Sequence, residues 1–358
     1  MATPRDTLAT LVERLFQPTA AQRRDGAMGA ELEVIPIRTR SLQRVPINAT
    51  QGGPGSADIA REAARVERWQ EETDDYGAPS WNMPDGGRLS YEPGGQFEIA
   101  SPVCSSAADL SDHLRSVLRV LRTSAASADV QLLAIGIDPY NAIDAVALEL
   151  HAPRYDAMTE YFNAIGEPGV RMMRQTASLH VSVEVGHNVM QRWGLLNALA
   201  PYLIAMFANS SRYGGGPTGY ASYRAHQWQT LDRTRTGLPF DSADPIGAYT
   251  QFARNAGRIL TEDADHLTTL FPEIRPRGYF EIRSLDAMEP DRIAHALQFI
   301  STLIHDPDTA AASLRIIGTP DSSLLARAAL NGRSDPLLKP RIDQLEQLVT
   351  EASGITPP

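Results

Sequence analysis

The chain has 358 residues, of which 42% are hydrophobic and 21% charged, and its formal net charge at pH 7 is −10. This composition is typical of a soluble globular protein, and the negative charge disfavours nucleic acid or an anionic membrane as the main partner. The single cysteine, Cys104, excludes an intrachain disulfide and a thiolate metal cluster.

No segment of the sequence predicts export or membrane insertion. The first residues include acidic side chains and lack the apolar core of a secretory signal. The most apolar stretch, residues 193–207, is shorter than the roughly 20 residues of a membrane span and contains Asn197 and Pro201. No linker or repeat divides the sequence. We therefore expect one cytoplasmic domain covering residues 1–358.

The first predicted strand carries two acidic side chains on one face. In residues 29–35 the two-residue period of a strand puts Glu31 and Glu33 together, opposite Ala30, Leu32 and Val34. Neighbouring like charges repel unless water or a cation separates them. The pair therefore indicates either a metal site or an exposed, solvated face of an antiparallel sheet.

A predicted hairpin between two predicted helices adds two more carboxylates. Glu92 and Glu98 lie on short strands around Pro93-Gly94-Gly95, a sequence suited to a turn. The helix before it follows a candidate cap at Ser56 and has apolar residues at helical spacing: Ile59, Ala63, Val66 and Trp69. The helix after it follows the capping pattern Ser106-x-x-Asp109.

Residues 176–185 predict a half-buried strand whose polar face includes His180. A lone histidine in a sheet is more often a hydrogen-bonded residue than a metal ligand. The polar neighbours of His180 make the two roles equally favoured. Further helices are predicted near residues 187–208, 245–258, 290–304 and 338–352.

Residues 209–237 predict a long loop that is rich in arginine and aromatic residues. Such side chains could recognise the carboxylate of an amino acid, and the alternative is a surface loop with solvated charges. The residues concerned are Tyr220, Tyr223, Arg224, His226, Trp228, Asp232, Arg233 and Arg235.

The last informative strand, residues 279–283, places Glu281 beside Arg283. Arg283 suits a bidentate contact with a transferring phosphate, and the alternative is a salt bridge between neighbouring strands. Carboxylates with an occasional imidazole suit Mg²⁺ or Mn²⁺, and Mg²⁺ commonly shares its shell with nucleotide phosphates. ATP is therefore the expected co-ligand.

Taken in order, these segments resemble the glutamate–cysteine ligases of the plant and actinobacterial type. The most specific piece is Glu92-Pro-Gly-Gly-Gln-Phe-Glu98, and it is followed by Met172-Met173, Asn209-Ser210, Gly219-Tyr-x-Ser-Tyr-Arg224, Asp232-x-x-Arg235-Thr-Gly237 and residues 279–286. The resemblance covers most of the chain. It implies an α+β fold in which a curved antiparallel sheet forms a funnel, as in glutamine synthetase, with helices outside.

The resemblance also implies roles for individual residues. The metal ligands would be Glu31, Glu33, Glu92, Glu98, His180 and Glu281. Arg283 and His180 would contact ATP, and Arg283, Glu281 and Arg235 would act in catalysis. The substrate would be bound by Tyr223, Arg224, Trp228 and Arg235.

The implied activity is formation of γ-glutamylcysteine from glutamate and cysteine through a γ-glutamyl phosphate, in glutathione or ergothioneine synthesis. The implied cofactors are ATP and Mg²⁺, with Mn²⁺ as a substitute, and the implied partners are small molecules. Two alternatives stay open: a ligase of the same chemistry that uses another amine or acid, and a non-catalytic paralogue that binds nucleotide or amino acid.

Overall fold

The computed structural model describes residues 7–18 and 25–354 and is built around one large antiparallel sheet. Its strands are β1 (Met28–Arg38), β2 (Gln70–Thr73), β3 (Pro79–Asn82), β4 (Arg88–Tyr91), β5 (Phe97–Ala100), β6 (Val130–Leu133), β7 (Ser178–Val183), β12 (Ile274–Pro276) and β13 (Phe280–Asp286). They lie in the order β12-β13-β7-β1-β5-β4-β3-β2, and β6 pairs with the second half of β1. Each of these pairings is antiparallel, as the sequence predicted.

Two small pairs of strands lie outside the main sheet. The antiparallel pair is β8 (Arg212–Tyr213) with β9 (Gly216–Pro217), and the parallel pair is β10 (Thr236–Gly237) with β11 (Phe271–Pro272).

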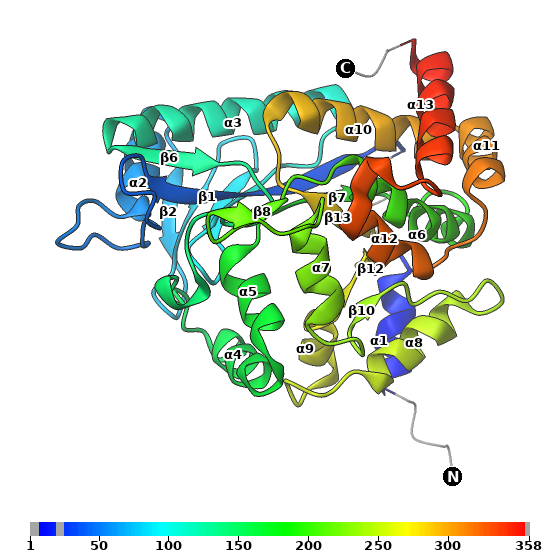
Figure 1. The fold of residues 1–358 in the computed structure, drawn as a ribbon, viewed down its shortest axis with the longest axis horizontal. Helices are drawn as coiled ribbons and strands as arrows, with labels where there is room; N and C mark the ends of the chain where they lie inside the picture. The colour runs from blue at the N-terminus through cyan, green and yellow to red at the C-terminus, as the bar shows by residue number, and fades with distance from the viewer. Residues whose placement is uncertain (1–6, 19–24, 355–358) are drawn as a thin grey trace.

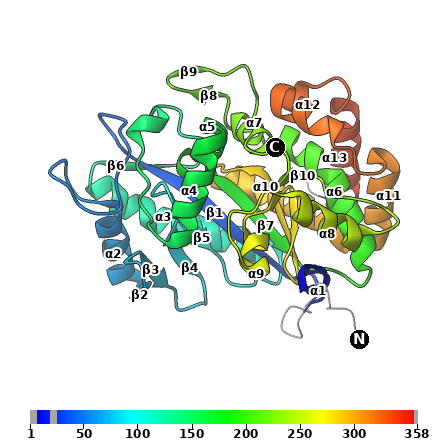
Figure 2. The same ribbon diagram turned by 90° about the horizontal axis from the view of Figure 1, so that it is seen from below.

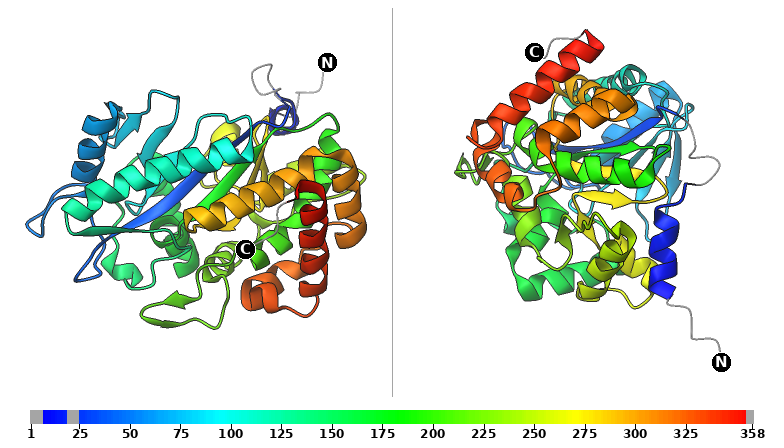
Figure 3. Two further views of the ribbon diagram at one scale, coloured as in Figure 1. Left: turned by 90° about the horizontal axis from the view of Figure 1, so that it is seen from above. Right: turned by 90° about the vertical axis from the view of Figure 1, so that its right-hand side faces the viewer.

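Helices cover both faces of the sheet. They are α1 (Thr7–Leu15), α2 (Ser56–Glu67), α3 (Ala107–Ser127), α4 (Pro153–Ile165), α5 (Glu167–Gln175), α6 (Val189–Met206), α7 (Tyr223–Thr230), α8 (Pro245–Asn255), α9 (Asp263–Thr268), α10 (Pro290–His305), α11 (Pro307–Ile317), α12 (Ser323–Asn331) and α13 (Lys339–Ser353), with short 3₁₀ turns η2 (Ile143–Ala145) and η3 (Gly332–Ser334). Helices α3 and α10 run together across the upper face of the sheet (Figure 1; Figure 3, left). Helices α4, α5, α7 and α9 lie on the lower side (Figure 2).

The upper face of the sheet is apolar, and the lower face is polar. Leu32 and Val34 of β1 are fully buried on the upper side, together with Val181 of β7 and Ile282 of β13. Burial of such side chains, at about 25 cal/mol per Å² of apolar surface, is the main term that holds α3, α6 and α10 on the sheet. The intervening residues of the same strands therefore face the lower helices.

Most of the predicted elements are present within a few residues of their expected bounds. The four later helices predicted from spacing correspond to α6, α8, α10 and α13. Ser106 caps α3, since its hydroxyl accepts a hydrogen bond from the Asp109 amide at 3.1 Å. No helix in residues 7–18 and 25–354 is long and apolar enough to cross a bilayer.

Three local predictions were wrong. Ser56 is the first residue of α2 and not its cap: its hydroxyl donates to the Tyr91 hydroxyl at 3.1 Å, and Asp58 accepts from the Gly55 amide at 2.9 Å. Val66 is 58% exposed, because α2 ends at the next residue. The segment 209–237 is not one extended loop, since it contains the helix α7 and the strands β8, β9 and β10.

Candidate active site

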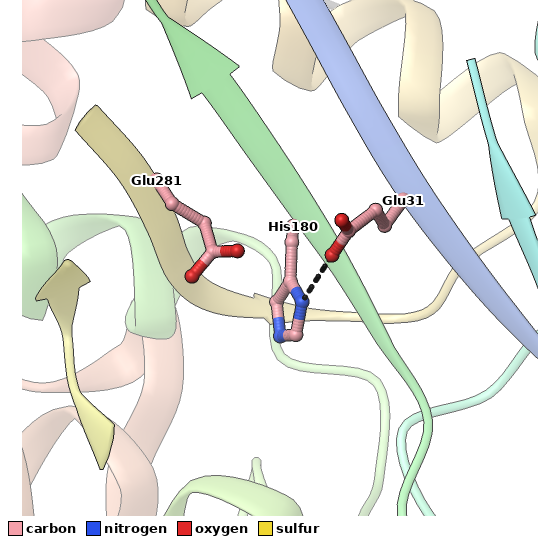
Figure 4. A group of neighbouring side chains, drawn as sticks. All are labelled: Glu31, His180 and Glu281. Carbon is pink, nitrogen blue, oxygen red and sulfur yellow. Dashed lines mark hydrogen bonds and ion pairs between the residues drawn. The ribbon is translucent and has the colours of Figure 1, made fainter. Parts of the chain in front are cut away.

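Three side chains from neighbouring strands meet on the lower face of the sheet. Glu31 of β1, His180 of β7 and Glu281 of β13 point toward one another, and their ligand atoms all lie within 4.8 Å of each other (Figure 4). Glu31 and His180 are register partners, and the His180 Nδ1 lies 3.4 Å from a Glu31 carboxylate oxygen. We call this group the histidine cluster.

A second acidic group lies further along β1, on the side of the β4–β5 hairpin. Glu33 of β1 pairs with Glu98 of β5, and Glu92 joins them from the turn that follows β4, with ligand atoms again within 4.8 Å of one another. We call this group the glutamate cluster. Ser178 connects the two clusters: its hydroxyl donates to Glu33 at 2.8 Å and lies 2.9 Å from the His180 Nε2.

The glutamate cluster is poorly suited to hold three negative charges by itself. Burial, followed by repulsion from Glu98 and Glu33, raises the pKa of Glu92 well above its usual range. Burial also raises the pKa of Glu98, and it raises that of Glu33 to about 7 even though Arg224 and Ser178 oppose the shift. A hard divalent cation would relieve this repulsion and would use the carboxylate oxygens as ligands. The donor set therefore fits Mg²⁺ or Mn²⁺.

The histidine cluster is bordered by arginines. Arg275 makes two hydrogen bonds to the Glu281 carboxylate at 2.6 and 3.0 Å, and Arg283 makes a third at 2.9 Å. Burial would raise the pKa of Glu281, but Arg275 and Arg283 outweigh it and hold the pKa well below the usual range. Burial, reinforced by Arg283, lowers the pKa of His180 to about 4, so its ring is neutral near pH 7 and suited to a metal.

Both clusters open into one cavity of about 410 Å³ beneath the sheet. Its upper side is formed by the strands that carry the carboxylates, and its lower wall by α4, α5, α7 and β11. Arg283 lines this cavity with a side chain that is only 6% exposed, and its Nε has no hydrogen-bond partner. Such a guanidinium is positioned to receive an anion.

The structure brings together the six predicted metal ligands and Arg283, but it corrects the predicted substrate-binding group. Arg235 does not line the cavity: it is fully buried and bonded to Asp232 at 2.8 Å and to the Thr269 carbonyl at 2.9 Å. Arg224 donates to the Arg283 carbonyl at 2.9 Å and so supports the site from behind.

The other two members of that group differ from each other. Tyr223 packs among Tyr213, Tyr220 and His226 and lies outside the cavity lining. Trp228 does line the cavity. Tyr223 and Trp228 differ because an α-helix turns successive side chains about 100° apart, so residues near in sequence on α7 point in different directions.

Several cavity residues were not predicted. Arg275 and Arg277 line the cavity beside Glu281, and Arg154 and Tyr155 approach it from the start of α4. The two arginines of the β12 segment have the same two-residue spacing as Glu281 and Arg283, so this pattern could have identified them. Nothing in the sequence of α4 distinguishes its contribution from that of an ordinary surface helix.

Comparison with solved structures first identifies the class of fold. A glutamate–cysteine ligase from Francisella tularensis in complex with AMP aligns with a TM-score of 0.53 and 12% identity, covering 92% of this chain and 78% of that one. At this identity the likeness shows the fold alone. The protein has the fold of a glutamate–cysteine ligase, as the sequence resemblance implied.

Comparison of sequences then identifies the family. Residues 27–334 match the model of glutamate–cysteine ligase family 2. Glutamate–cysteine ligase EgtA of Mycolicibacterium smegmatis is 32% identical over 306 residues, covering 72% of this chain and 71% of that protein. The chloroplastic glutamate–cysteine ligase of Arabidopsis thaliana is 28% identical over 264 residues, covering 63% of this chain and 50% of that protein. The chain belongs to glutamate–cysteine ligase family 2.

Proposed function

We propose that this protein is an ATP-dependent ligase that joins the γ-carboxylate of L-glutamate to the amine of L-cysteine. The observation that carries the proposal is the meeting of two acidic clusters and the partly unpaired Arg283 in one cavity. Phosphoryl transfer requires little covalent participation by the protein, so positioned cations and arginines are the groups it needs.

Each cluster is proposed to hold one divalent cation, Mg²⁺ or its substitute Mn²⁺. The histidine cluster would supply Glu31, His180 and Glu281, and the glutamate cluster would supply Glu33, Glu92 and Glu98. A bound cation would neutralise charge on phosphate oxygens during phosphoryl transfer.

The nucleoside of ATP is proposed to occupy a second hollow next to the histidine cluster. This hollow of about 220 Å³ also includes Glu31, and it is lined mainly by the ends of β1, β5 and β7 together with Tyr279. Gly29 and Ser182 are small residues of its lining, and its other residues are largely apolar. A base bound there would direct its phosphates toward Glu31 and Arg283.

The chemistry would then follow in two displacements. An oxygen of the glutamate γ-carboxylate attacks the γ-phosphorus of ATP, and the bond to the bridging oxygen breaks to release ADP. The cysteine nitrogen attacks the carbonyl carbon of the resulting γ-glutamyl phosphate, and phosphate leaves as the amine loses a proton. Arg283 is proposed to hold the phosphoryl oxygens in both steps, since a guanidinium matches their geometry.

The test is ADP release by the purified protein with Mg·ATP and L-glutamate, with and without L-cysteine, followed by mass analysis of the product. Cysteine-dependent ADP release together with γ-glutamylcysteine is the expected result. ADP release without that product would mean that the protein is a ligase that uses another amine acceptor. Absence of ADP release with every amine, despite nucleotide binding, would support the non-catalytic alternative. The cytoplasmic location stays a prediction.

A further inference from the structure

A second cavity lies beside the active-site cavity, on the side of α1, α8 and α9 (Figure 1). Its volume is about 400 Å³. We call it the arginine cavity, because its lining includes Arg14, Arg154, Arg275 and Arg277. Within the described part of the chain it shares no lining residue with the hollow assigned to the nucleoside. It is therefore a separate place for a ligand.

Three of the four arginines line both the arginine cavity and the active-site cavity: Arg154, Arg275 and Arg277. Arg275 donates to the Glu281 carboxylate from Nε at 2.6 Å and from Nη2 at 3.0 Å. The Arg277 Nη1 lies 3.7 Å from the same carboxylate. The partition between the two cavities is thus cationic, and it also holds one of the proposed metal ligands.

The charge of the arginine cavity has one sign. None of its lining residues that the structure describes is acidic. Arg154 donates to the Thr268 carbonyl at 3.0 Å, but its buried Nε has no hydrogen-bond partner among the described residues. Burial lowers the pKa of Arg154, and repulsion from Arg275 and Arg277 adds to this shift. An anion in the cavity would relieve the repulsion and accept hydrogen bonds from these side chains.

The opposite side of the arginine cavity is apolar. It is formed by Leu11 and Leu15 of α1 and Leu267 of α9, which belong to or pack against the main core. An inorganic anion would use the cationic side alone, whereas an organic anion would also bury apolar surface against the leucines. The volume lies within the range of roughly 300–1,000 Å³ that is usual for small-molecule sites.

We propose that the arginine cavity is a second ligand site, which binds a small organic phosphate with an apolar body. A phosphate offers more oxygens than a carboxylate to several guanidinium groups at once. This inference goes beyond the proposed function and does not depend on it, because binding requires no turnover. Since Arg275 and Arg277 line both cavities, anions in the two cavities compete for the same N–H groups, and each weakens the binding of the other.

The first arm of the test measures ligand binding to the wild-type protein without nucleotide, metal or glutamate. Isothermal titration calorimetry compares phenyl phosphate with inorganic phosphate and with benzoate near neutral pH. We expect phenyl phosphate to bind at least about tenfold more tightly than either, because only phenyl phosphate uses both sides of the cavity fully. Equal affinity for phenyl phosphate and inorganic phosphate, or no binding of phenyl phosphate at millimolar concentrations, would overturn the proposal.

The second arm identifies the cavity through Arg14, which lies on the exposed surface of α1 and outside the lining of the active-site cavity. Arg14→Gln should raise the Kd for phenyl phosphate by about tenfold, because one charged hydrogen-bond donor is lost. ADP release with Mg·ATP, glutamate and cysteine should stay at the wild-type level. Arg65→Gln is the matched control, since Arg65 is an exposed arginine on α2 that lines neither cavity, and it should change neither quantity.

If Arg14→Gln binds phenyl phosphate as tightly as wild type, the ligand lies in the active-site cavity and the proposal is wrong. Should Arg14→Gln fail to fold, Gln17→Glu serves the same purpose, since Gln17 is exposed, lines only the arginine cavity of the two, and would place a negative charge there. Unchanged binding in Gln17→Glu would also overturn the proposal. The calorimetric result stands even if no ADP release is found, so failure of the proposed function and failure of this site are distinguishable.

Discussion

Glu281 shows how single residues of the site depend on one another. Its carboxylate is 1% exposed and carries bonds from Arg275 and Arg283, with Arg277 3.7 Å away. A buried carboxylate surrounded in this way stays ionised, which a metal ligand requires. The same contacts hold Arg283 against the cavity, so that its remaining N–H groups are available to an anion.

The geometry of Arg283 matters as much as its charge. Arg283→Lys keeps the charge but lacks the planar fork of donors that can hold Glu281 and two phosphate oxygens together, so we expect kcat for ADP formation to fall by roughly 10² to 10³. Steady-state kinetics with glutamate and cysteine measures this. Arg65→Lys, which changes an exposed arginine paired with Glu62 on α2, is the control and should behave as wild type. A decrease of less than threefold in Arg283→Lys would remove Arg283 from catalysis.

The candidate ligands could be predicted from sequence because a strand alternates its side chains strictly between two faces. Glu31 and Glu33 had to share a face, and so did Glu281 and Arg283, whatever the rest of the fold. Their association into two clusters depends on strand order, which β-periodicity does not contain. Arg235 was misassigned because its guanidinium forms a structural ion pair with Asp232, three residues away.

At the scale of elements, the hairpin between β4 and β5 positions the glutamate cluster. Its turn lies against the end of α5: a Cβ built on Gly94 would lie 2.2 Å from the Arg174 carbonyl oxygen and 2.5 Å from its Cα. Gln96, in the same turn, donates to the Thr176 carbonyl at 2.8 Å. The hairpin and α5 thus pack against each other, and this contact fixes the position of Glu92.

Gly94→Ala should therefore disturb both stability and activity. Because the obstacle is backbone and cannot rotate away, we expect a loss of about 1–3 kcal/mol in the free energy of unfolding, together with a lower kcat as Glu92 moves. Urea denaturation and ADP release measure the two effects. Gly216→Ala is the matched control, since a Cβ there meets no atom within 4 Å. Equal stability of the two variants would contradict this account of the turn.

An ion pair links α4, the segment that follows α7 and the residue that follows α9. Arg235 bonds Asp232 at 2.8 Å and the Thr269 carbonyl at 2.9 Å, and the Tyr161 hydroxyl donates to Asp232 at 2.8 Å. Burial would raise the pKa of Asp232, but these hydrogen bonds and those from Thr234 outweigh it and lower the pKa to about 2. The ion pair is therefore a structural clamp with a defined pH dependence.

Since the folded pKa of Asp232 lies below the unfolded value of about 4, its ionised form stabilises the folded state above pH 4, and this contribution is lost as the pH falls through 2. The shift corresponds to about 2 kcal/mol. Asp232→Asn should thus be less stable than wild type at pH 7 by about that amount, and the difference should shrink below pH 4. Urea unfolding at several pH values tests this. Asp75→Asn, at an exposed position, is the control and should be as stable as wild type.

The elements themselves were predictable where they are long or strictly alternating. Helices such as α6 and α10 have enough turns for the apolar spacing to be recognised. Helices α5, α7 and α9 have nine residues or fewer, and short helices depend on tertiary packing more than on their own propensity. Of the helices that close the cavity from below, α5 and α7 were therefore not indicated by the sequence.

At the scale of the whole molecule, the cavity lies between two hydrophobic clusters. The main core covers the upper face of the sheet, supports the strands with the carboxylates and extends to α1, α8 and α9. The smaller cluster lies below the cavity and contributes Met158, Met172, Met173 and Phe271 to its lining. Sequence resemblance predicted the sheet with its carboxylates, since these belong to the family's common fold. The smaller cluster below the cavity comes from packing between α4, α5 and α7, for which the pattern of residues gives no direct signal.

Because six candidate cation ligands converge under the sheet, we expect binding of cation and nucleotide to stabilise the entire fold jointly. A ligand at 100 times its Kd adds about 2.7 kcal/mol to the free energy of unfolding. We expect Mg·ATP to raise Tm by a few degrees, and by more than the sum of the shifts caused by Mg²⁺ alone and ATP alone. Differential scanning fluorimetry with each component and with both measures this.

Glu98→Gln separates this explanation from general salt or nucleotide effects. The substitution removes one of three repelling carboxylates, so without ligands the variant should melt at or above the wild-type Tm, whereas its joint shift with Mg·ATP should be lost. Glu72→Gln, on the exposed strand β2, should keep both properties. If ligand-free Glu98→Gln has a lower Tm than wild type and keeps the Mg·ATP shift, the glutamate cluster is structural. Removal of a cation ligand would instead relieve the repulsion and weaken cation binding at the same time.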